Sequence, residues 1–167
     1  MKLLKPDAFK KAVEEIDLHK LSAEGKRNLI IDLEGTLISR ETWEVLPEKL
    51  NWIQKAKDAG FKIHLISNTI RIRRAKEISK LFGVPIIPAS FKPLPFSFIK
   101  ATKVLGTRAS NSAVIGDQLF MDVLGGNLLG FYTILVKPMS NERKLSRKLM
   151  RWLEGLFFKP GTSGLSL

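Results

Sequence analysis

Short apolar runs alternate with amphipathic segments along most of the chain. The apolar runs predict buried strands over residues 28–32, 61–66, 84–87, 112–116 and 131–136. Between them, apolar residues recur three or four positions apart, which predicts helices over residues 47–59, 70–82, 96–105 and 119–129. Strands that alternate with helices of this length indicate an α/β fold, with right-handed crossovers and helices on both faces of a mostly parallel sheet.

Both ends of the chain carry further helical patterns. Apolar residues separated by lysines predict an N-terminal amphipathic helix over residues 7–17. A basic amphipathic helix is expected over about residues 142–158, with apolar side chains on one face and arginines on the other. This second helix could contact a membrane peripherally through residues 142–159, or it could pack on its own domain or on a partner.

Composition fits a globular protein, with 44% hydrophobic and 26% charged residues, and we expect one domain over residues 1–167 with its core at about 26–138. No apolar run reaches the roughly 20 residues that a membrane span needs, and the N-terminus does not resemble a signal peptide. Cysteine is absent, and structural roles are expected for His19 and His64. The expected location is the cytoplasm, with peripheral contact at the inner face of the membrane if the C-terminal helix binds lipid.

The net charge of +12 is the compositional outlier. It favours anionic partners, which could be phosphorylated substrates, nucleic acid or acidic lipid surfaces. Composition alone does not choose among these three.

Polar residues that can do chemistry follow four of the predicted strands. Ligands of parallel sheets bind at the carboxyl ends of the strands, so these side chains are expected at one edge. In chain order they are Asp32 and Glu34, then Ser67 and Asn68, then Lys92, and finally Asp117 and Asp122.

This set suits phosphoryl transfer. Asp32 would be the nucleophile that forms an aspartyl-phosphate, and Glu34 would protonate the leaving oxygen and then activate water. Ser67 and Lys92 would hold the transferring phosphoryl group by hydrogen bonding and charge. The residues expected to bind the remainder of the substrate are Thr36, Asn68, Arg71 and Arg74.

A divalent cation would offset the repulsion between these carboxylates and a phosphate. Mg²⁺ prefers oxygen ligands and needs few carboxylates when phosphate and water complete its shell. The expected metal-site residues are Asp32, Glu34, Asp117 and Asp122.

Taken singly, each of these residues has a simpler interpretation. Ser67 could cap a helix, Lys92 could be a solvated loop charge, and Asp122 could be an exposed helical residue. Gly116-Asp117 could be a turn. The arginines at 71, 73 and 74 could form a solvated basic face instead of lining a site that attracts anions.

The same residues resemble the four ordered motifs of the haloacid dehalogenase superfamily of phosphatases. The motifs stand here as Asp32-Leu33-Glu34-Gly35-Thr36, Ser67, Lys92-Pro93 and Gly116-Asp117-Gln118-Leu119-Phe120-Met121-Asp122. The stretch from Asp122 to Asn127 and the strand from Tyr132 to Val136 extend the resemblance to the YqeG-type branch, which includes phosphatidylglycerophosphate phosphatases. Differences from the usual pattern are Glu34 in place of aspartate, Gly35 in place of asparagine, Met121 in place of threonine and Leu128 in place of arginine.

The segments between the motifs are short, so no sizeable cap domain is expected. The resemblance implies a three-layer Rossmann-like sandwich whose five strands, numbered along the chain, take the order 3-2-1-4-5. It implies a Mg²⁺-dependent phosphomonoesterase that acts on phosphatidylglycerophosphate or on another phosphate carried by a large molecule. Two alternatives stay open. One is a weakly active or non-catalytic relative that binds nucleic acid, ribonucleoprotein or anionic lipid, because Glu34 is one methylene longer than aspartate. The other is a phosphatase for soluble nucleotides or sugar phosphates.

Overall fold

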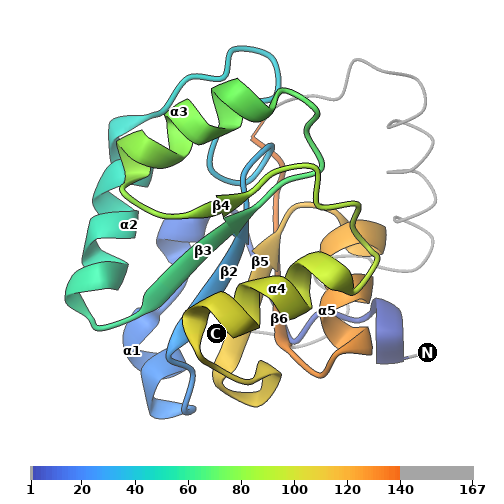
Figure 1. The fold of residues 1–167 in the computed structure, drawn as a ribbon. Helices are drawn as coiled ribbons and strands as arrows, with labels where there is room; N and C mark the ends of the chain where they lie inside the picture. The colour runs from blue at the N-terminus through green and yellow to red at the C-terminus, as the bar shows by residue number, and fades with distance from the viewer. Residues whose placement is uncertain (1, 140–167) are drawn as a thin grey trace.

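Six parallel strands form one sheet in the computed structural model, which describes residues 2–139 (Figure 1). The sheet order is β1-β6-β5-β2-β3-β4, and each neighbouring pair is parallel. The strands are β1 (Ala8–Lys10), β2 (Asn28–Asp32), β3 (Lys62–Ile66), β4 (Ile86–Ile87), β5 (Ser112–Gly116) and β6 (Tyr132–Val136). The five predicted strands and their order are therefore confirmed, and β1 adds a sixth strand beside β6.

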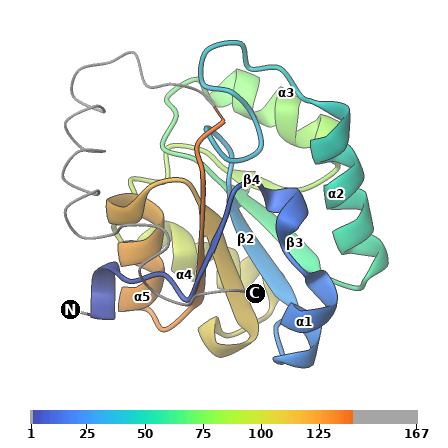
Figure 2. The same cartoon turned by 180° about the vertical axis from the view of Figure 1, so that it is seen from behind.

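Helices cover both faces of the sheet (Figures 1 and 2). They are α1 (Leu18–Ala23), α2 (Pro47–Asp58), α3 (Ile72–Phe82), α4 (Phe96–Leu105) and α5 (Leu124–Leu128). A π-helical turn, Leu119–Val123, leads into α5, so the helix predicted over residues 119–129 has two parts. Short 3₁₀ turns occupy Lys2–Leu4, Val13–Glu15 and Ala109–Asn111.

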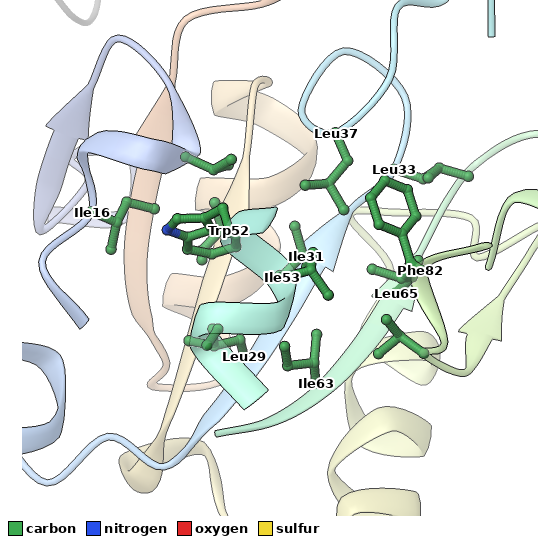
Figure 3. Packing of buried hydrophobic residues seen from close by; sticks show 14 of the residues in the cluster. Ile16, Leu29, Ile31, Leu33, Leu37, Trp52, Ile53, Ile63, Leu65 and Phe82 are labelled. Atoms are coloured by element: carbon green, nitrogen blue, oxygen red, sulfur yellow. The ribbon is translucent and has the colours of Figure 1, made fainter. Parts of the chain in front are cut away.

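Side chains of β2 point alternately to the two faces of the sheet and pack in two separate hydrophobic cores. Leu29 and Ile31 pack with Trp52 and other side chains of α2 and α3 on one face, as Figure 3 shows. Ile30, between them in sequence, packs on the other face with Phe98 of α4. Because successive strand side chains point to opposite faces, a fully apolar strand is needed where helices cover both sides.

The predicted N-terminal helix over residues 7–17 is wrong. Ala8–Lys10 forms β1, which pairs with β6, and Val13–Glu15 is a 3₁₀ turn. The apolar residues that suggested one helical face belong to different cores, since Val13 packs on the α2 side and Phe9 packs against the cluster that contains Leu119. Helix formation starts only at Leu18, after Asp17 accepts a capping hydrogen bond from the Lys20 amide at 2.9 Å.

Two predictions for the C-terminal region, the helix at about 142–158 and the membrane contact at 142–159, lie outside the described residues. Within residues 2–139, no helix combines the length and apolar character that crossing a bilayer requires.

Candidate active site

The four strand ends named by the sequence meet at one edge of the sheet, around a cavity of about 370 Å³. Asp32 ends β2, and Ser67, Lys92 and Asp117 follow β3, β4 and β5. The cavity is lined by Asp32, Glu34, Arg40, Trp43, Ser67, Asn68, Thr69, Ile70, Arg71, Lys92 and Gln118. Asp117 and Asp122 are fully buried and are not among the lining residues, but they contact the lining residues Arg40 and Lys92.

Lys92 joins two carboxylates at the floor. Its Nζ donates to Oδ1 of Asp32 and to Oδ1 of Asp122, the latter at 2.6 Å, and all three side chains are buried. Burial alone would lower the pKa of Lys92, but Asp122 and Asp32 outweigh burial and raise this pKa well above its usual value. The ammonium group is therefore protonated and compensates both carboxylates.

Burial has the opposite effect on the pKa values of the two carboxyl groups, Asp32 and Asp122, from its effect on Lys92. Burial raises the pKa of Asp32 to about 7, against the effect of Lys92, while Asp122 and Asp117 add repulsion. The pKa of Asp122 is also raised, mainly by burial. Ionised carboxylates that lie close together and away from water carry a high free-energy cost. An additional cation would therefore stabilise the cluster.

Arg40 is the second cation at the floor. Its guanidinium donates to Asp117 in a bidentate arrangement, with Nη1–Oδ2 and Nη2–Oδ1 distances of 2.7 and 2.8 Å. The pair is well buried, since the Arg40 and Asp117 side chains are 7% and 0% exposed. A planar fork of this kind matches a carboxylate better than a lysine does.

Three of the carboxylates could share one metal ion. Asp32, Asp117 and Asp122 each offer an oxygen, and these oxygens lie within 4.8 Å of one another. Buried carboxylate oxygens are suitable ligands for a hard divalent cation, and a carboxylate has enough lone pairs to serve a metal and a donor together. The donor set therefore fits such an ion, whereas Glu34, also predicted as a ligand, lies outside this group.

Two glycines allow the backbone to approach this cluster. A Cβ at Gly116 would overlap the carboxyl group of Asp122, so only glycine lets the π-helical turn close over the end of β5. A Cβ at Gly35, whose φ is +90°, would meet the Arg40 guanidinium and Asp117 Oδ2. Gly35 therefore makes room for the Arg40–Asp117 pair.

Asn68 positions the loop that carries Lys92. Its Oδ1 accepts hydrogen bonds from the Lys92 amide and the Ser90 hydroxyl, both at 2.7 Å, and its Nδ2 donates to the Lys92 carbonyl at 3.1 Å. Asn68 was predicted to bind substrate, and it does line the cavity, but these three bonds give its amide a positioning role.

The other predicted residues fall into two groups. Glu34, Ser67 and Arg71 line the cavity, and the Ser67 hydroxyl donates to Glu34 Oε1 at 3.4 Å. Thr36 and Arg74 are not among the lining residues. The Thr36 hydroxyl instead lies 3.4 Å from Asp32 Oδ2, and Arg74 stacks over Trp43 with its charge 5.6 Å from the ring centre.

Arg40 and Trp43 are lining residues that the sequence did not indicate. Both lie in the irregular segment between β2 and α2, where hydrophobic periodicity carries no information. Trp43 is only 4% exposed and lies under the guanidinium groups of Arg71 and Arg74. An aromatic residue in a predicted loop beside a basic helix was the available signal for this wall of the site.

A family model described as haloacid dehalogenase-like hydrolase matches residues 3–130. The chain belongs to this family. It is 33% identical over 153 residues to the probable phosphatase YqeG of Bacillus subtilis, a match that covers 92% of this chain and 88% of that protein. The family match and this relative support phosphatase activity.

Two further members of the comparison are more distant. Phosphatidylglycerophosphate phosphatase 1 of Arabidopsis thaliana is 25% identical over 166 residues, which cover 89% of this chain and 48% of that protein. The solved structure of a p-nitrophenyl phosphatase from Archaeoglobus fulgidus has the same fold, with a TM-score of 0.55, 18% identity and coverage of 81% and 94% of the two chains. The Rossmann-like haloacid dehalogenase fold predicted from the sequence is thereby confirmed.

Proposed function

We propose that this protein is a Mg²⁺-dependent phosphomonoesterase that works through an aspartyl-phosphate on Asp32. The observation that carries the proposal is the position of Asp32, which lines the open cavity on one side and contacts Lys92 on the other. A carboxylate held in this way is oriented for attack, and an adjacent ammonium can compensate the oxygens of an incoming phosphoryl group.

In the first step, a carboxylate oxygen of Asp32 forms a bond to phosphorus while the bond from phosphorus to the leaving oxygen breaks. Glu34, which lines the cavity, gives its proton to that oxygen. In the second step, Glu34 takes a proton from a water molecule that attacks phosphorus, and the acyl-phosphate bond breaks to release phosphate and free Asp32. Ser67, also at the cavity wall, hydrogen-bonds the phosphoryl oxygens during both steps.

Asp32, Asp117 and Asp122 are the residues that would hold Mg²⁺. When bound, the ion would supply positive charge that offsets the negative charge of the phosphoryl oxygens. Arg40 and Asn68 act indirectly, since Arg40 orients Asp117 and Asn68 fixes the backbone of Lys92.

The substrate that we propose is phosphatidylglycerophosphate or another phosphate presented on a large carrier. The name of the Arabidopsis relative supports this choice. So does the short connection between β2 and α2, which leaves no room in residues 33–46 for a cap domain over the cavity. An uncapped site suits a phosphate that cannot be enclosed.

Phosphate release from a panel of substrates tests the proposal. The panel contains phosphatidylglycerophosphate, a nucleotide and a sugar phosphate, each with Mg²⁺ or a chelator. We expect Mg²⁺-dependent release by the wild type, loss of at least about 10³-fold in Asp32→Asn, and normal release by Asp58→Asn, an exposed control on α2. Full activity in Asp32→Asn or in chelator would reject the mechanism, and preference for the soluble compounds would reject the substrate.

Glu34→Asp tests the length of the acid/base side chain. If Glu34 transfers the proton, the shorter carboxylate should change the turnover number about tenfold or more in either direction, because a shift of about 1 Å alters such rates strongly. An inactive wild type with an active Glu34→Asp variant would instead favour a protein that binds phosphorylated ligands without turnover.

A further inference from the structure

Four large apolar residues are exposed on the loops that follow β3 and β4 and at the start of α4. Ile70, Phe91, Leu94 and Phe96, here called the apolar rim, are 88%, 70%, 51% and 72% exposed. Ile70 lines the cavity, and Phe91 directly precedes Lys92 at its floor. Single exposed apolar residues are ordinary, but four on adjoining segments beside a functional cavity indicate an interaction surface.

Backbone hydrogen bonds hold the two loops of the rim together. The amide of Ala89 donates to the Thr69 carbonyl at 3.1 Å, and the amide of Ser90 donates to the Ser67 carbonyl at 2.9 Å. A turn between Phe91 and Leu94, closed by a 3.0 Å hydrogen bond, then leads into α4. Both loops leave the carboxyl ends of β3 and β4, which lie side by side in Figure 1.

Phe91 has a strained backbone conformation. Its φ of 52° lies in the left-handed region, which disfavours a bulky L-residue and suits glycine or asparagine. Since 70% of the residue is exposed, packing of its side chain offsets little of the energetic cost of this conformation. Residues with strained backbone conformations are concentrated at active sites, ligand-binding segments and switch regions.

The part of the chain that carries the apolar rim is strongly basic. Residues 68–107 contain one acidic residue, Glu77, and it pairs with Arg73 at 3.3 Å. The same stretch contains eight basic residues, of which all but Lys92 are exposed: Arg71, Arg73, Arg74, Lys76, Lys80, Lys92, Lys100 and Lys103. Exposed apolar side chains on a basic segment are complementary to a surface that offers an apolar layer beneath anionic groups.

We propose that the apolar rim docks this protein on an anionic membrane surface, with the cavity mouth facing the lipid phosphates. This inference rests on the proposed function, because docking would bring a lipid-borne phosphate to Asp32. The rim side chains enter the boundary between headgroups and acyl chains, and the arginines and lysines meet the anionic headgroups. A duplex nucleic acid would match the charge, but its phosphate backbone offers no apolar layer for Ile70 and Leu94.

Flotation of the full chain with vesicles tests the docking surface. The vesicles contain equal parts of phosphatidylglycerol and phosphatidylcholine, or phosphatidylcholine alone. The rim variant carries Phe91→Ser, Leu94→Ser and Phe96→Ser, while Ile70 is kept because it lines the cavity. The control variant carries Leu81→Ser and Leu128→Ser, at positions 64% and 56% exposed near the far ends of α3 and α5.

We expect the wild type and the control to partition onto the anionic vesicles within about twofold of each other, and the rim variant at least about tenfold more weakly. Binding of the wild type should weaken as salt is raised and should be low on phosphatidylcholine alone. Equal partitioning of the rim variant and the wild type would overturn the proposal. So would a wild-type dimer that the rim substitutions convert to monomer, since the rim would then be a self-association surface.

Activity separates failure of docking from failure of the proposed function. The rim variant should hydrolyse a short-chain, water-soluble phosphatidylglycerophosphate at the wild-type rate and should be at least about tenfold slower on the same headgroup in vesicles. If no variant hydrolyses either form, the proposed function fails while flotation still decides the docking. Equal rates on vesicles for the rim variant and the wild type would overturn the docking.

Discussion

Arg40 binds both carboxylate oxygens of Asp117 through a guanidinium fork, at 2.7 and 2.8 Å. Asp117 is also one of the three carboxylates that could share a metal ion. The buried Asp117 carboxylate is thus placed to bind both the Arg40 guanidinium and a metal ion. Because one carboxylate serves both, the free energy of unfolding should depend on metal binding.

The variant Arg40→Ala should lose about 3–5 kcal/mol of unfolding free energy in chelator, because it leaves the buried Asp117 carboxylate without its guanidinium. Mg²⁺ should then raise the melting temperature more than it does in the wild type, since the ion takes over part of that compensation. Thermal unfolding with and without Mg²⁺ measures both effects. Arg73→Ala, at a side chain 96% exposed, should cost less than about 1 kcal/mol and keep the wild-type response to Mg²⁺. The same response to Mg²⁺ in Arg40→Ala as in the wild type would contradict the coupling.

Lys92 should matter more for stability than Lys49, which is also buried. Lys92→Met leaves two buried carboxylates without their cation and should cost about 3–5 kcal/mol. Lys49→Met should cost less, because its partner Glu14 has a side chain 29% exposed and can be hydrated. Urea denaturation measures the unfolding free energy of both variants. An equal loss of unfolding free energy in the two would contradict the role of Lys92 in compensating two buried carboxylates.

Gly116→Ala should disable the site by displacing Asp122, whose carboxyl group occupies the place of the added methyl group. We expect at least about a hundredfold loss of phosphatase activity, because a shift of about 1 Å in a reacting group has that effect. The control is Gly106→Ala, which meets no atom within 4 Å and should cost about 1–2 kcal/mol for its positive φ without loss of activity. Normal turnover by a folded Gly116→Ala variant would refute this account of the close approach.

His64 should make the fold sensitive to mild acid. Burial lowers the pKa of His64 below 6.5, against the hydrogen bond to the Leu65 carbonyl at 2.9 Å, and Lys100 lowers it further. The unfolded chain therefore binds a proton first, so stability is full above about pH 6.5 and falls as the pH drops through the folded-state pKa. Asp32 acts in the opposite sense, because its pKa is raised to about 7 and its protonation stabilises the fold as the pH drops. The effect of His64 is therefore measured as the difference in unfolding free energy between the wild type and His64→Gln, which should shift in favour of His64→Gln as the pH falls from 8 to 5. Identical profiles would exclude His64 as the cause.

Hydrophobic patterning predicted the central strands because they are apolar on both faces, as Leu29, Ile30 and Ile31 are. It failed at β1, where three residues give too short a pattern for period two to show. What makes Ala8–Lys10 a strand is its pairing with β6, and a carboxylate of Asp7 that accepts from the Thr133 amide at 2.8 Å. Such a contact between distant residues leaves no local signal.

Some residues of the candidate site were likewise predictable from the sequence and others were not. The acidic residues and Lys92 were predictable because each follows a strand, and the topology then brings the ends together. Arg40 was not, since its partner Asp117 is 77 residues away and its segment has no regular structure. For Asn68, residue type and position indicated the cavity correctly, but only the hydrogen bonds to Ser90 and Lys92 distinguish a positioning role from a binding one.

The pairing of β1 with β6 also sets an order of events during synthesis. Asp7 and Thr133 are 126 residues apart, so the earliest strand to leave the ribosome has its neighbour only when nearly all of the described chain has been made. At roughly 5–20 residues per second, that interval lasts about 6–25 s. During this time residues 8–10 lack the partner with which they form a strand, so β1 can join the sheet only after β6 has been made.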